Sequence, residues 1–166
     1  GLSLVGSEMC IRDRFDSTAG LLTDTMIFLS LGHKVVAVEQ SKIIYSLVKD
    51  AILRAKNMIP ELKNLIFLND NSLNVYKSIS KGFDVIYLDP MYPSLHKKNK
   101  KSGRLENIKK ILEIENLSEN GENLVKDFFN LEYKKIILKR PLKYRKNYSN
   151  INYQVLGKTT RFDIYL

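Results

Sequence analysis

The 166-residue sequence predicts an α/β fold, with a mostly parallel sheet, helices on both of its faces and an antiparallel strand near the C-terminus. Three short apolar strands alternate with helical segments in units of about thirty residues, a spacing typical of right-handed βαβ crossovers. Near the C-terminus, the turn-prone pair Gly157-Lys158 separates two strand-like runs. Because that connection is short, these two strands are expected to pair antiparallel.

The elements follow in order. After a turn at 15–20, apolar residues recur at helical spacing over 21–31, and Gly32 ends that helix. A short buried strand covers 34–40, and Ser41 can cap a helix that ends before Pro60. The other predicted elements are strands at 65–68, 84–88, 134–141, 153–156 and 161–166, and helices at 69–79, 105–117 and 124–129.

The stretch from Phe83 to Leu88 is almost continuously apolar, which is typical of a strand buried on both faces of a parallel sheet. Asp89 follows it, and Pro90 and Pro93 then impose a stiff turn because proline fixes φ and has no N–H group. A carboxylate, a rigidly held carbonyl and the ring of Tyr92 are therefore expected at the carboxyl end of this strand. Open α/β sheets bind their ligands there.

The composition indicates one domain with a substantial core, since 44% of the residues are hydrophobic. Twenty-seven Lys and Arg residues against 18 acids give a net charge of +9, which suits a polyanionic partner and equally a solvated surface. No apolar run approaches the ~20 residues of a membrane span, so no membrane contact is expected. The single Cys10 excludes an internal disulfide and a zinc cluster, and with no recognisable export signal a cytoplasmic location is expected.

Residues 1–14 (GLSLVGSEMCIRDR) differ from the rest of the chain because they show no clean periodicity. They look like translated sequencing-adapter read-through, and we expect a non-native leader at 1–14 followed by a single, N-terminally truncated domain at 15–166. A genuine irregular N-terminal arm is the alternative.

Polar residues follow each of the first four strands, and in a parallel sheet these ends share one edge. Asp16, Glu39, the segment 70–72 and Asp89 are expected to line that crevice. Glu39 lies about twenty residues beyond the glycine turn, where an acid binds ribose hydroxyls in nucleotide-binding folds. Asp70-Asn71-Ser72 can recognise ribose or an adenine edge, although Asp70 or Ser72 taken singly can simply cap a helix.

The turn between Asp16 and Leu22 bears on the choice of cofactor. A dinucleotide fingerprint needs three glycines, whereas this turn has only Gly20, with Leu22 two residues on. A pyrophosphate site is poorly supported. S-adenosylmethionine (SAM), a nucleoside that carries a sulfonium and a carboxylate, asks less of the turn.

Asp89, Pro90 and Tyr92 suggest the reaction. An exocyclic amino group on a base is a poor nucleophile because its lone pair is delocalised into the ring. The Asp89 carboxylate and the Pro90 carbonyl can accept the amino hydrogens, and Tyr92 can stack on the base, so that catalysis consists of positioning and electrostatics without a metal. A turn that merely ends a strand is the alternative.

Several motifs together resemble the ribosomal RNA small subunit methyltransferase J family. They are Asp16-Ser-Thr-Ala-Gly20, Glu39, Tyr87-Leu-Asp-Pro-Met-Tyr-Pro93, Lys139-Arg-Pro141 and Arg161-Phe-Asp-Ile-Tyr165. The resemblance implies a Rossmann-like class I methyltransferase sheet of seven strands and methyl transfer from SAM to the N2 amino group of a guanine in 16S rRNA. An amino methyltransferase for adenine N6 and an inactive RNA-binding fragment are the alternatives.

The resemblance also implies cofactor contacts, and the shared strand edge adds others. The implied contacts are Thr23, Asp24, Glu39, Gln40, Asn71, Ser72 and Asp89, and the edge adds Asp16, Ala19, Gly20 and Asp70. The family's turn has the sequence A-G-L-G-R-D, whereas here Leu22 replaces a glycine and Thr23 an arginine. Gln40 likewise replaces an arginine.

Two basic groups flank the same edge and are expected to contact RNA phosphates, although a solvated lysine-rich loop is the simpler alternative. They comprise Lys97, Lys98, Lys100, Lys101 and Arg104 after the proline turn, and Lys139 and Arg140 at the end of the fifth strand. The expected partner is 16S rRNA or the small ribosomal subunit. The target base is expected to be flipped out or unpaired, and the protein to be a monomer.

Overall fold

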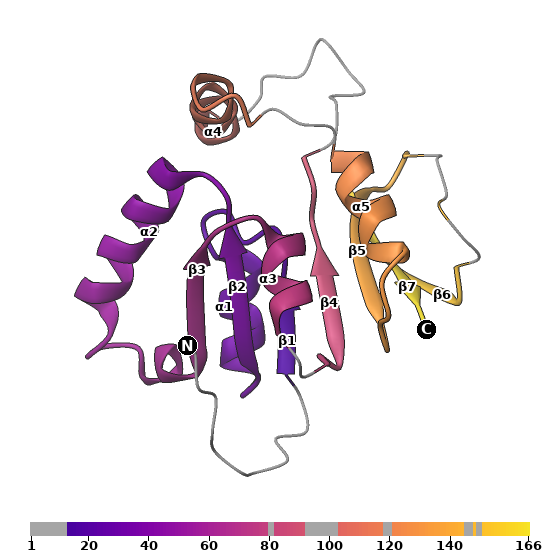
Figure 1. Cartoon of the computed structure of the whole chain (residues 1–166), viewed down its shortest axis with the longest axis horizontal. Helices are drawn as coiled ribbons and strands as arrows, with labels where there is room; N and C mark the ends of the chain where they lie inside the picture. Colours follow the sequence, from indigo (N-terminus) through magenta and orange to yellow (C-terminus); the bar gives the residue numbers. More distant parts are fainter. Residues whose placement is uncertain (1–12, 80–81, 92–102, 118–120, 145–147, 149–150) are drawn as a thin grey trace.

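The computed structural model describes residues 13–79, 82–91, 103–117, 121–144, 148 and 151–166. Its centre is a sheet of seven strands (Figure 1). The strands are β1 (Asp13–Asp16), β2 (Lys34–Glu39), β3 (Leu65–Asn69), β4 (Val85–Leu88), β5 (Ile136–Pro141), β6 (Tyr153–Leu156) and β7 (Thr160–Tyr165). They lie in the order β3-β2-β1-β4-β5-β7-β6.

The strand directions confirm the fold class expected from the sequence. The strands from β3 to β5 in this order are all parallel, and β7 is antiparallel to both β5 and β6. The predicted antiparallel pair at the C-terminus is therefore confirmed. The strand order reverses at β1, which pairs with β2 on one side and with β4 on the other. The carboxyl end of β1 is therefore where an open α/β sheet is expected to bind its ligand.

The first strand of the sheet begins earlier than any element that the sequence predicted. Asp13 and Arg14, which we assigned to the leader, form the first half of β1 and pair with Lys34 and Val35 of β2. Arg14 also lies opposite Val85 of β4. Sequence reasoning missed this strand because a charged pair lacks the continuous apolar pattern of a buried strand.

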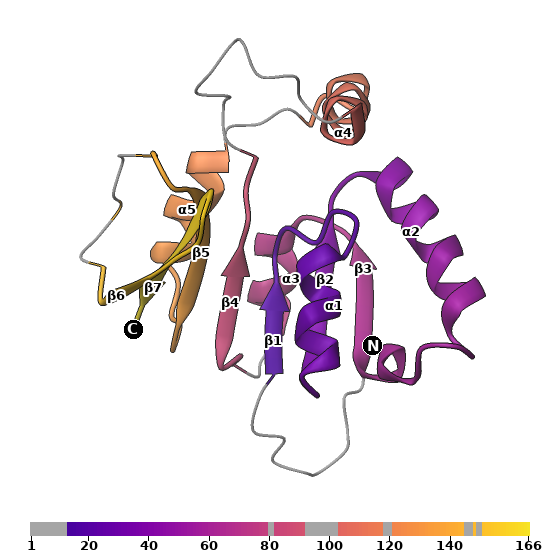
Figure 2. The ribbon, with the colours of Figure 1, turned by 180° about the vertical axis from the view of Figure 1, so that it is seen from behind.

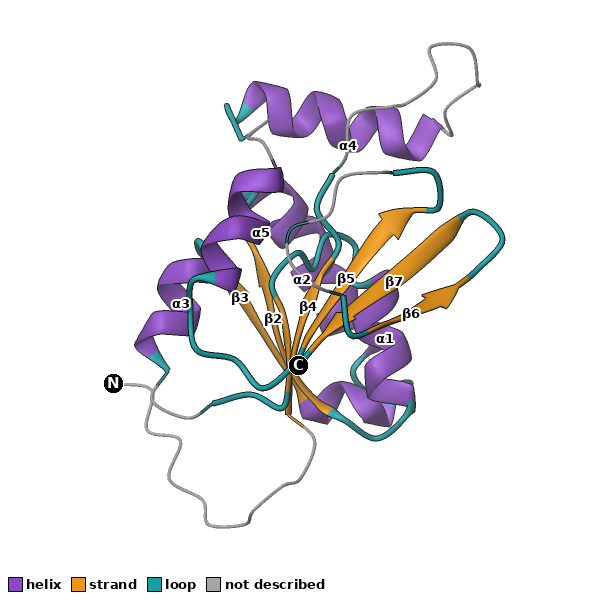
Figure 3. Ribbon diagram, turned by 90° about the vertical axis from the view of Figure 1, so that its right-hand side faces the viewer, coloured by secondary structure: helices purple, strands orange, loops and turns teal. Residues whose placement is uncertain are grey.

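Helices cover both faces of the sheet, as Figure 3 shows. They are α1 (Thr23–Ser30), α2 (Lys42–Ala55), α3 (Ser72–Ser78), α4 (Gly103–Ile114), α5 (Gly121–Phe129) and a 3₁₀ helix, η1 (Pro60–Asn64). One face carries α1 and α2, and the other carries α3 and α5, while α4 lies beyond the carboxyl ends of the parallel strands (Figures 1 and 2). No helix in the described part of the chain has the length and apolar character needed to cross a bilayer.

Each face of the sheet has its own apolar core. The core under α3 and α5 is centred on Phe15, Ile86 and Phe128, whose side chains are fully buried. The core under α1 and α2 includes Leu22 and Leu29, and residues of α4 pack against its edge. Segments far apart in sequence are thereby anchored around the carboxyl edge of the sheet.

The turn between β1 and α1 contains two residues in the left-handed region of the backbone map. Gly20 has a φ of 50°, which glycine adopts readily, but Leu22 has a φ of 60°, which costs about 1–2 kcal/mol for a residue with a Cβ atom. The Leu22 side chain is nevertheless 4% exposed and belongs to the core under α1 and α2. Its apolar burial offsets the backbone strain.

Two substitutions at Leu22 separate these effects. Leu22→Ala removes the buried side chain and keeps the strain, so we expect the free energy of unfolding to fall by about 2–4 kcal/mol. Leu22→Gly removes the same side chain and also relieves the strain, so it should be about 1 kcal/mol more stable than Leu22→Ala. Urea unfolding measures both, and a glycine variant less stable than the alanine variant would contradict the strain.

Candidate active site

Hydrogen bonds tie the turn after β1 to the ends of both neighbouring strands. The backbone N–H and the hydroxyl of Ser17 both donate to the carbonyl of Tyr87, each at 3.1 Å. The N–H of Ala19 donates to the carbonyl of Val38 at 3.1 Å. The hydroxyl oxygen of Thr18 accepts the N–H of Asp89 at 2.7 Å. The predicted site segments of β1, β2 and β4 therefore meet at one edge, as the sheet topology requires.

Glu39 holds the glycine turn in place. One carboxylate oxygen accepts the N–H of Gly20 at 2.9 Å and the other accepts that of Ser41 at 2.7 Å. The residue is 8% exposed, and burial raises the pKa of its carboxyl although both amides favour the charged form. A carboxylate has about four lone-pair positions, so these bonds leave acceptor capacity for a ribose hydroxyl. The residues present at this edge thus fit a nucleoside cofactor.

The residues of the polar segment after β3 differ in role: one caps a helix, one is exposed and one is buried. Asn71, rather than Asp70 or Ser72, is the N-cap of α3, and its side-chain oxygen accepts the N–H of Leu73 at 3.0 Å. Asp70 is exposed and its carboxylate accepts the N–H of Asn71 at 2.6 Å, whereas Ser72 is buried. The capping alternative applies to this segment, but through a different residue.

Asn69 is a site residue that sequence reasoning missed. Its side-chain amide donates to the backbone carbonyls of Glu39 and Gln40 at 2.8 and 3.2 Å. These bonds connect the ends of β2 and β3 and leave the side chain of Gln40 exposed at the edge. An asparagine at the last position of an apolar strand is the signal that could have identified it.

A charged cluster lies next to this edge on the face that carries α1. The ammonium nitrogen of Lys139 lies 2.7 Å from a carboxylate oxygen of Asp24 and 3.0 Å from one of Asp89. The Tyr87 hydroxyl donates to the same Asp24 oxygen at 2.7 Å. The buried Asp16 completes the cluster, where it accepts hydrogen bonds from the hydroxyl of Thr25 and the N–H of Thr18.

The cluster shifts the protonation of its members. Burial raises the pKa of Asp16 to about 6, against the hydrogen bonds from Thr25 and Thr18. Burial also raises the pKa of Asp89, and the ammonium of Lys139 opposes that rise. Burial lowers the pKa of Lys139, but its two carboxylate partners outweigh this effect and the net shift is upward. Burial and the bond to Asp24 raise the pKa of Tyr87, so the phenol stays protonated.

Two of the cations expected to contact RNA, Lys139 and Arg140, pair with carboxylates inside the protein. Lys139 is held in the cluster just described, with 23% of its side chain exposed. Arg140 is 1% exposed, pairs with the buried Asp163 at 3.2 Å and lies over the rings of Tyr144 and Tyr148. The expectation that Arg140 contacts phosphate is corrected, because alternation along β5 turns this residue into the core.

The turn after β4 is only partly within the described residues. Pro90 is buried, and a side chain at Gly121, the first residue of α5, would have its Cβ 2.6 Å from that of Pro90. The start of α5 therefore packs directly on the proline and holds the turn. Tyr92, Lys97, Lys98, Lys100 and Lys101 lie outside the described residues, as does the side chain of Arg104.

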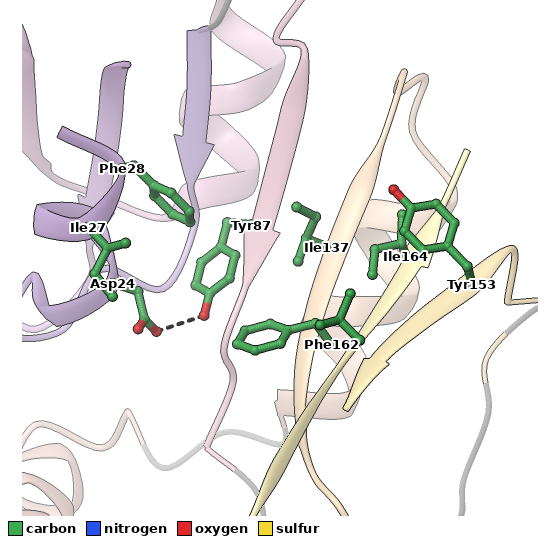
Figure 4. A pocket seen from close by; sticks show the side chains of 9 residues that line it. Asp24, Ile27, Phe28, Tyr87, Ile137, Tyr153, Phe162 and Ile164 are labelled. Atoms are coloured by element: carbon green, nitrogen blue, oxygen red, sulfur yellow. Dashed lines mark hydrogen bonds between the residues drawn. The ribbon is translucent and has the colours of Figure 1, made fainter. Parts of the chain in front are cut away.

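A cavity of about 310 Å³ adjoins the charged cluster (Figure 4). Asp24 and Tyr87 form its polar end, and its other walls are apolar side chains of α1, β5, β6 and β7. Phe162, which lines this cavity, lies opposite Lys139 in the β5–β7 pairing. Asp24 is the carboxylate of the cluster that lines this cavity, and the apolar wall lies beside it.

The comparisons with known proteins agree with this geometry. A family model described as "Putative SAM-dependent methyltransferase" matches residues 5–166. The chain belongs to this family of SAM-dependent methyltransferases. Within the described residues, no group of three or more His, Cys, Asp or Glu side chains is arranged to hold a metal ion.

Curated relatives of this chain have the name that the sequence motifs indicated. A protein from Francisella tularensis subsp. novicida, named ribosomal RNA small subunit methyltransferase J, is 34% identical over 158 residues. A protein of the same name from Francisella philomiragia is 33% identical over 159 residues. Each alignment covers 90% of this chain and 64% of the relative. The chain therefore spans somewhat less than two thirds of the length of these relatives.

Solved structures confirm the methyltransferase fold. A SAM-dependent methyltransferase from Neisseria gonorrhoeae superposes with a TM-score of 0.65 at 27% identity, over 93% of this chain and 61% of that one. The N-terminal domain of human METTL16, in complex with SAH, gives a TM-score of 0.51 at 12% identity, over 96% of this chain and 62% of that one. The second similarity concerns the fold alone.

The buried Asp16 predicts that the stability of this domain depends on pH. Its folded pKa of about 6 exceeds the ordinary value of 3.8, so the folded state binds more protons between these values and becomes less stable as the pH rises through them. A shift of about two units corresponds to roughly 3 kcal/mol. Asp16→Asn should therefore flatten the fall in the free energy of unfolding between about pH 4 and pH 6.

Urea unfolding across this pH range measures the effect. Burial also raises the pKa values of Glu39 and Asp89, and both carboxyls are present in the variant and in the unmodified protein. Because Asp16 and Asp89 are coupled, loss of the Asp16 charge also lowers the pKa of Asp89, which flattens the slope in the same direction. The exposed Asp50→Asn variant is the matched control, since it removes a carboxylate with 67% side-chain exposure. Equal pH slopes for Asp16→Asn and the unmodified protein would show that Asp16 does not titrate in this range.

Proposed function

We propose that this protein transfers a methyl group from SAM to the exocyclic N2 of a guanine in 16S rRNA. The observation that carries the proposal is the position of Asp89 and Pro90. They follow β4 at the edge where Glu39 organises the glycine turn, in a chain of the SAM-dependent methyltransferase family. The names of the relatives support the rRNA substrate. The N2 position comes from the resemblance in the motifs.

The cofactor is proposed to lie across the ends of β1, β2 and β4. The remaining acceptor capacity of Glu39 suits a ribose hydroxyl, and the exposed Gln40 and Asp70 lie at the same edge. The other proposed contacts are Asp16, Ala19, Gly20, Thr23, Asp24, Asn71, Ser72 and Asp89. When bound, SAM supplies an electrophilic methyl group whose transfer leaves a neutral thioether.

The chain contributes orientation and acceptor groups to the reaction. Asp89 and the Pro90 carbonyl accept the hydrogens of the target amino group, which localises its lone pair on nitrogen. That lone pair forms the new N–C bond while the electrons of the S–C bond remain on sulfur. The methylated nitrogen then releases one proton, to Asp89 or to water. Tyr92 is proposed to stack on the base and hold it in line.

The basic segment after the proline turn is proposed to bind rRNA phosphates. Lys97, Lys98, Lys100, Lys101 and Arg104 follow Tyr92 directly in the chain, and the net charge of +9 favours a polyanionic substrate. Lys139 and Arg140 are left out of this surface, because the first already pairs with two carboxylates and the second is buried.

The decisive experiment measures methyl transfer from tritiated SAM to purified 30S subunits, followed by nucleoside analysis. We expect label in N2-methylguanosine. Asp89→Ala should reduce turnover by about 10²-fold or more, because it removes the acceptor of the amino hydrogens, and should leave RNA affinity nearly unchanged. Asp84→Ala is the matched control, since Asp84 precedes β4 at the opposite end and pairs with Lys134 at 3.0 Å.

Each other outcome identifies a different function. Label in N6-methyladenosine would replace guanine N2 with adenine N6 as the target. Full activity of Asp89→Ala would remove this residue from the mechanism. If calorimetry detects no SAM binding at millimolar concentration while RNA binding is intact, the protein is an inactive RNA-binding fragment. The left-handed backbone of Leu22 favours this alternative.

The role of the basic segment is tested by the salt dependence of RNA binding. Changing Lys98 and Lys101 to Ala should reduce the slope of log affinity against log salt concentration by about 1–2, because each phosphate contact releases counterions. The control changes Lys63 and Lys134 to Ala, which precede β3 and β5 at the opposite edge of the sheet. An unchanged slope for the Lys98 and Lys101 variant would place these lysines in bulk solvent.

A further inference from the structure

Lys139 occupies an unusual position for a surface cation. Side chains of β5 alternate between buried and half-buried, and Lys139 shares the face of Ile137, which lines the cavity next to α1. Leu88 pairs with Leu138, so the next residues along the two parallel strands, Asp89 and Lys139, are level with each other. The strand register thus brings the ammonium group to the end of β4.

The ammonium group of Lys139 bridges two carboxylates of a cluster of three. It contacts Asp24 at 2.7 Å and Asp89 at 3.0 Å, and Asp16 is close enough to both acids for their negative charges to raise its pKa. All of these groups are partly or fully shielded from water. Like charges this close repel each other strongly at reduced dielectric, so the cluster needs a cation.

We propose that Lys139 is a positioning residue for methyl transfer, which clamps one carboxylate oxygen of Asp89, Oδ2, and so turns the other, Oδ1, toward the target amino group. This inference rests on the proposed function and deepens it. Lys139 contacts neither the base nor the methyl group. It acts through Asp89, whose backbone is held independently by the hydroxyl of Thr18.

The clamp has a second consequence, which concerns the charge of Asp89. Only the carboxylate form accepts two hydrogen bonds without donating one, so a protonated Asp89 would lose much of its function. The described groups that face it are Asp16 from β1, Asp24 from α1, Tyr87 from β4 and Lys139 from β5. Burial and Asp24 raise the pKa of Asp89, and Lys139 opposes them. Without the lysine, Asp89 would therefore take up a proton at higher pH.

The test compares Lys139→Met, which keeps the apolar stem and removes the charge, with Lys139→Arg and the unmodified protein. Lys134→Met is the matched control. Lys134 precedes β5 at the opposite edge of the sheet, and it also pairs with an aspartate, Asp84, at 3.0 Å. Turnover and KM for 30S subunits are measured from about pH 6 to pH 9 in the methyl transfer assay.

For Lys139→Met we expect kcat at pH 7 to fall about 10- to 100-fold, with KM for 30S subunits within about threefold of the original. The acidic limb of the kcat profile should move up by about one pH unit, so that part of the activity returns at high pH. Lys139→Arg should restore most of the turnover, and Lys134→Met should match the unmodified protein.

Other results would overturn the proposal. A rise in KM with kcat unchanged would make Lys139 an RNA phosphate contact, and a loss of kcat equal at every pH would make it a structural residue. If the unmodified protein transfers no methyl group, the proposed function fails, and the clamp is tested alone by a ¹³C titration of the Asp89 carboxyl, assigned with Asp89→Asn. An Asp89 pKa that is the same with and without Lys139 would then refute the clamp.

Discussion

The convergence of three parallel strand ends on one turn is the constraint on which the rest of the site depends. Ser17 and Ala19 donate to the carbonyls of Tyr87 and Val38, and Glu39 accepts the N–H of Gly20. These bonds satisfy backbone groups that a sheet edge would otherwise leave exposed, and they fix the distances between the ends of β1, β2 and β4. The same bonds place Asp16, Glu39 and Asp89 around one edge.

The second organising feature is electrostatic. Asp16, Asp24 and Asp89 are held in a partly buried cluster, an arrangement that costs free energy unless a cation or protons neutralise it. Lys139 supplies the cation, and the raised pKa of Asp16 supplies a group that holds its proton more readily than usual. Perturbed groups of this kind concentrate at functional sites, which agrees with the methyltransferase family of the chain.

The sequence identified the acids at the strand ends but gave the wrong surroundings for two basic residues, and both outcomes have physical causes. Asp89-Pro90 and Glu39 were recognisable because each ends an apolar run, and such ends share one edge in any parallel sheet. Lys139 was recognised as functional but was assigned to RNA, since a run of basic residues gives no sign of which face each side chain occupies. Arg140 was assigned with it, although its neighbouring position on the strand turns it into the core beside Asp163.

The sequence by itself determined the fold class, the alternation of strands and helices, the antiparallel strands at the C-terminus and the acids at the strand ends. These features follow from local periodicity and from residues that terminate strands, both of which are visible in a short window of sequence. Only the tertiary structure decided that Asp13 and Arg14 complete β1, that Asn69 connects β2 with β3, and that Lys139 bridges Asp24 and Asp89. These are contacts between residues 21 to 115 positions apart, and strand register, which no local pattern encodes, sets them.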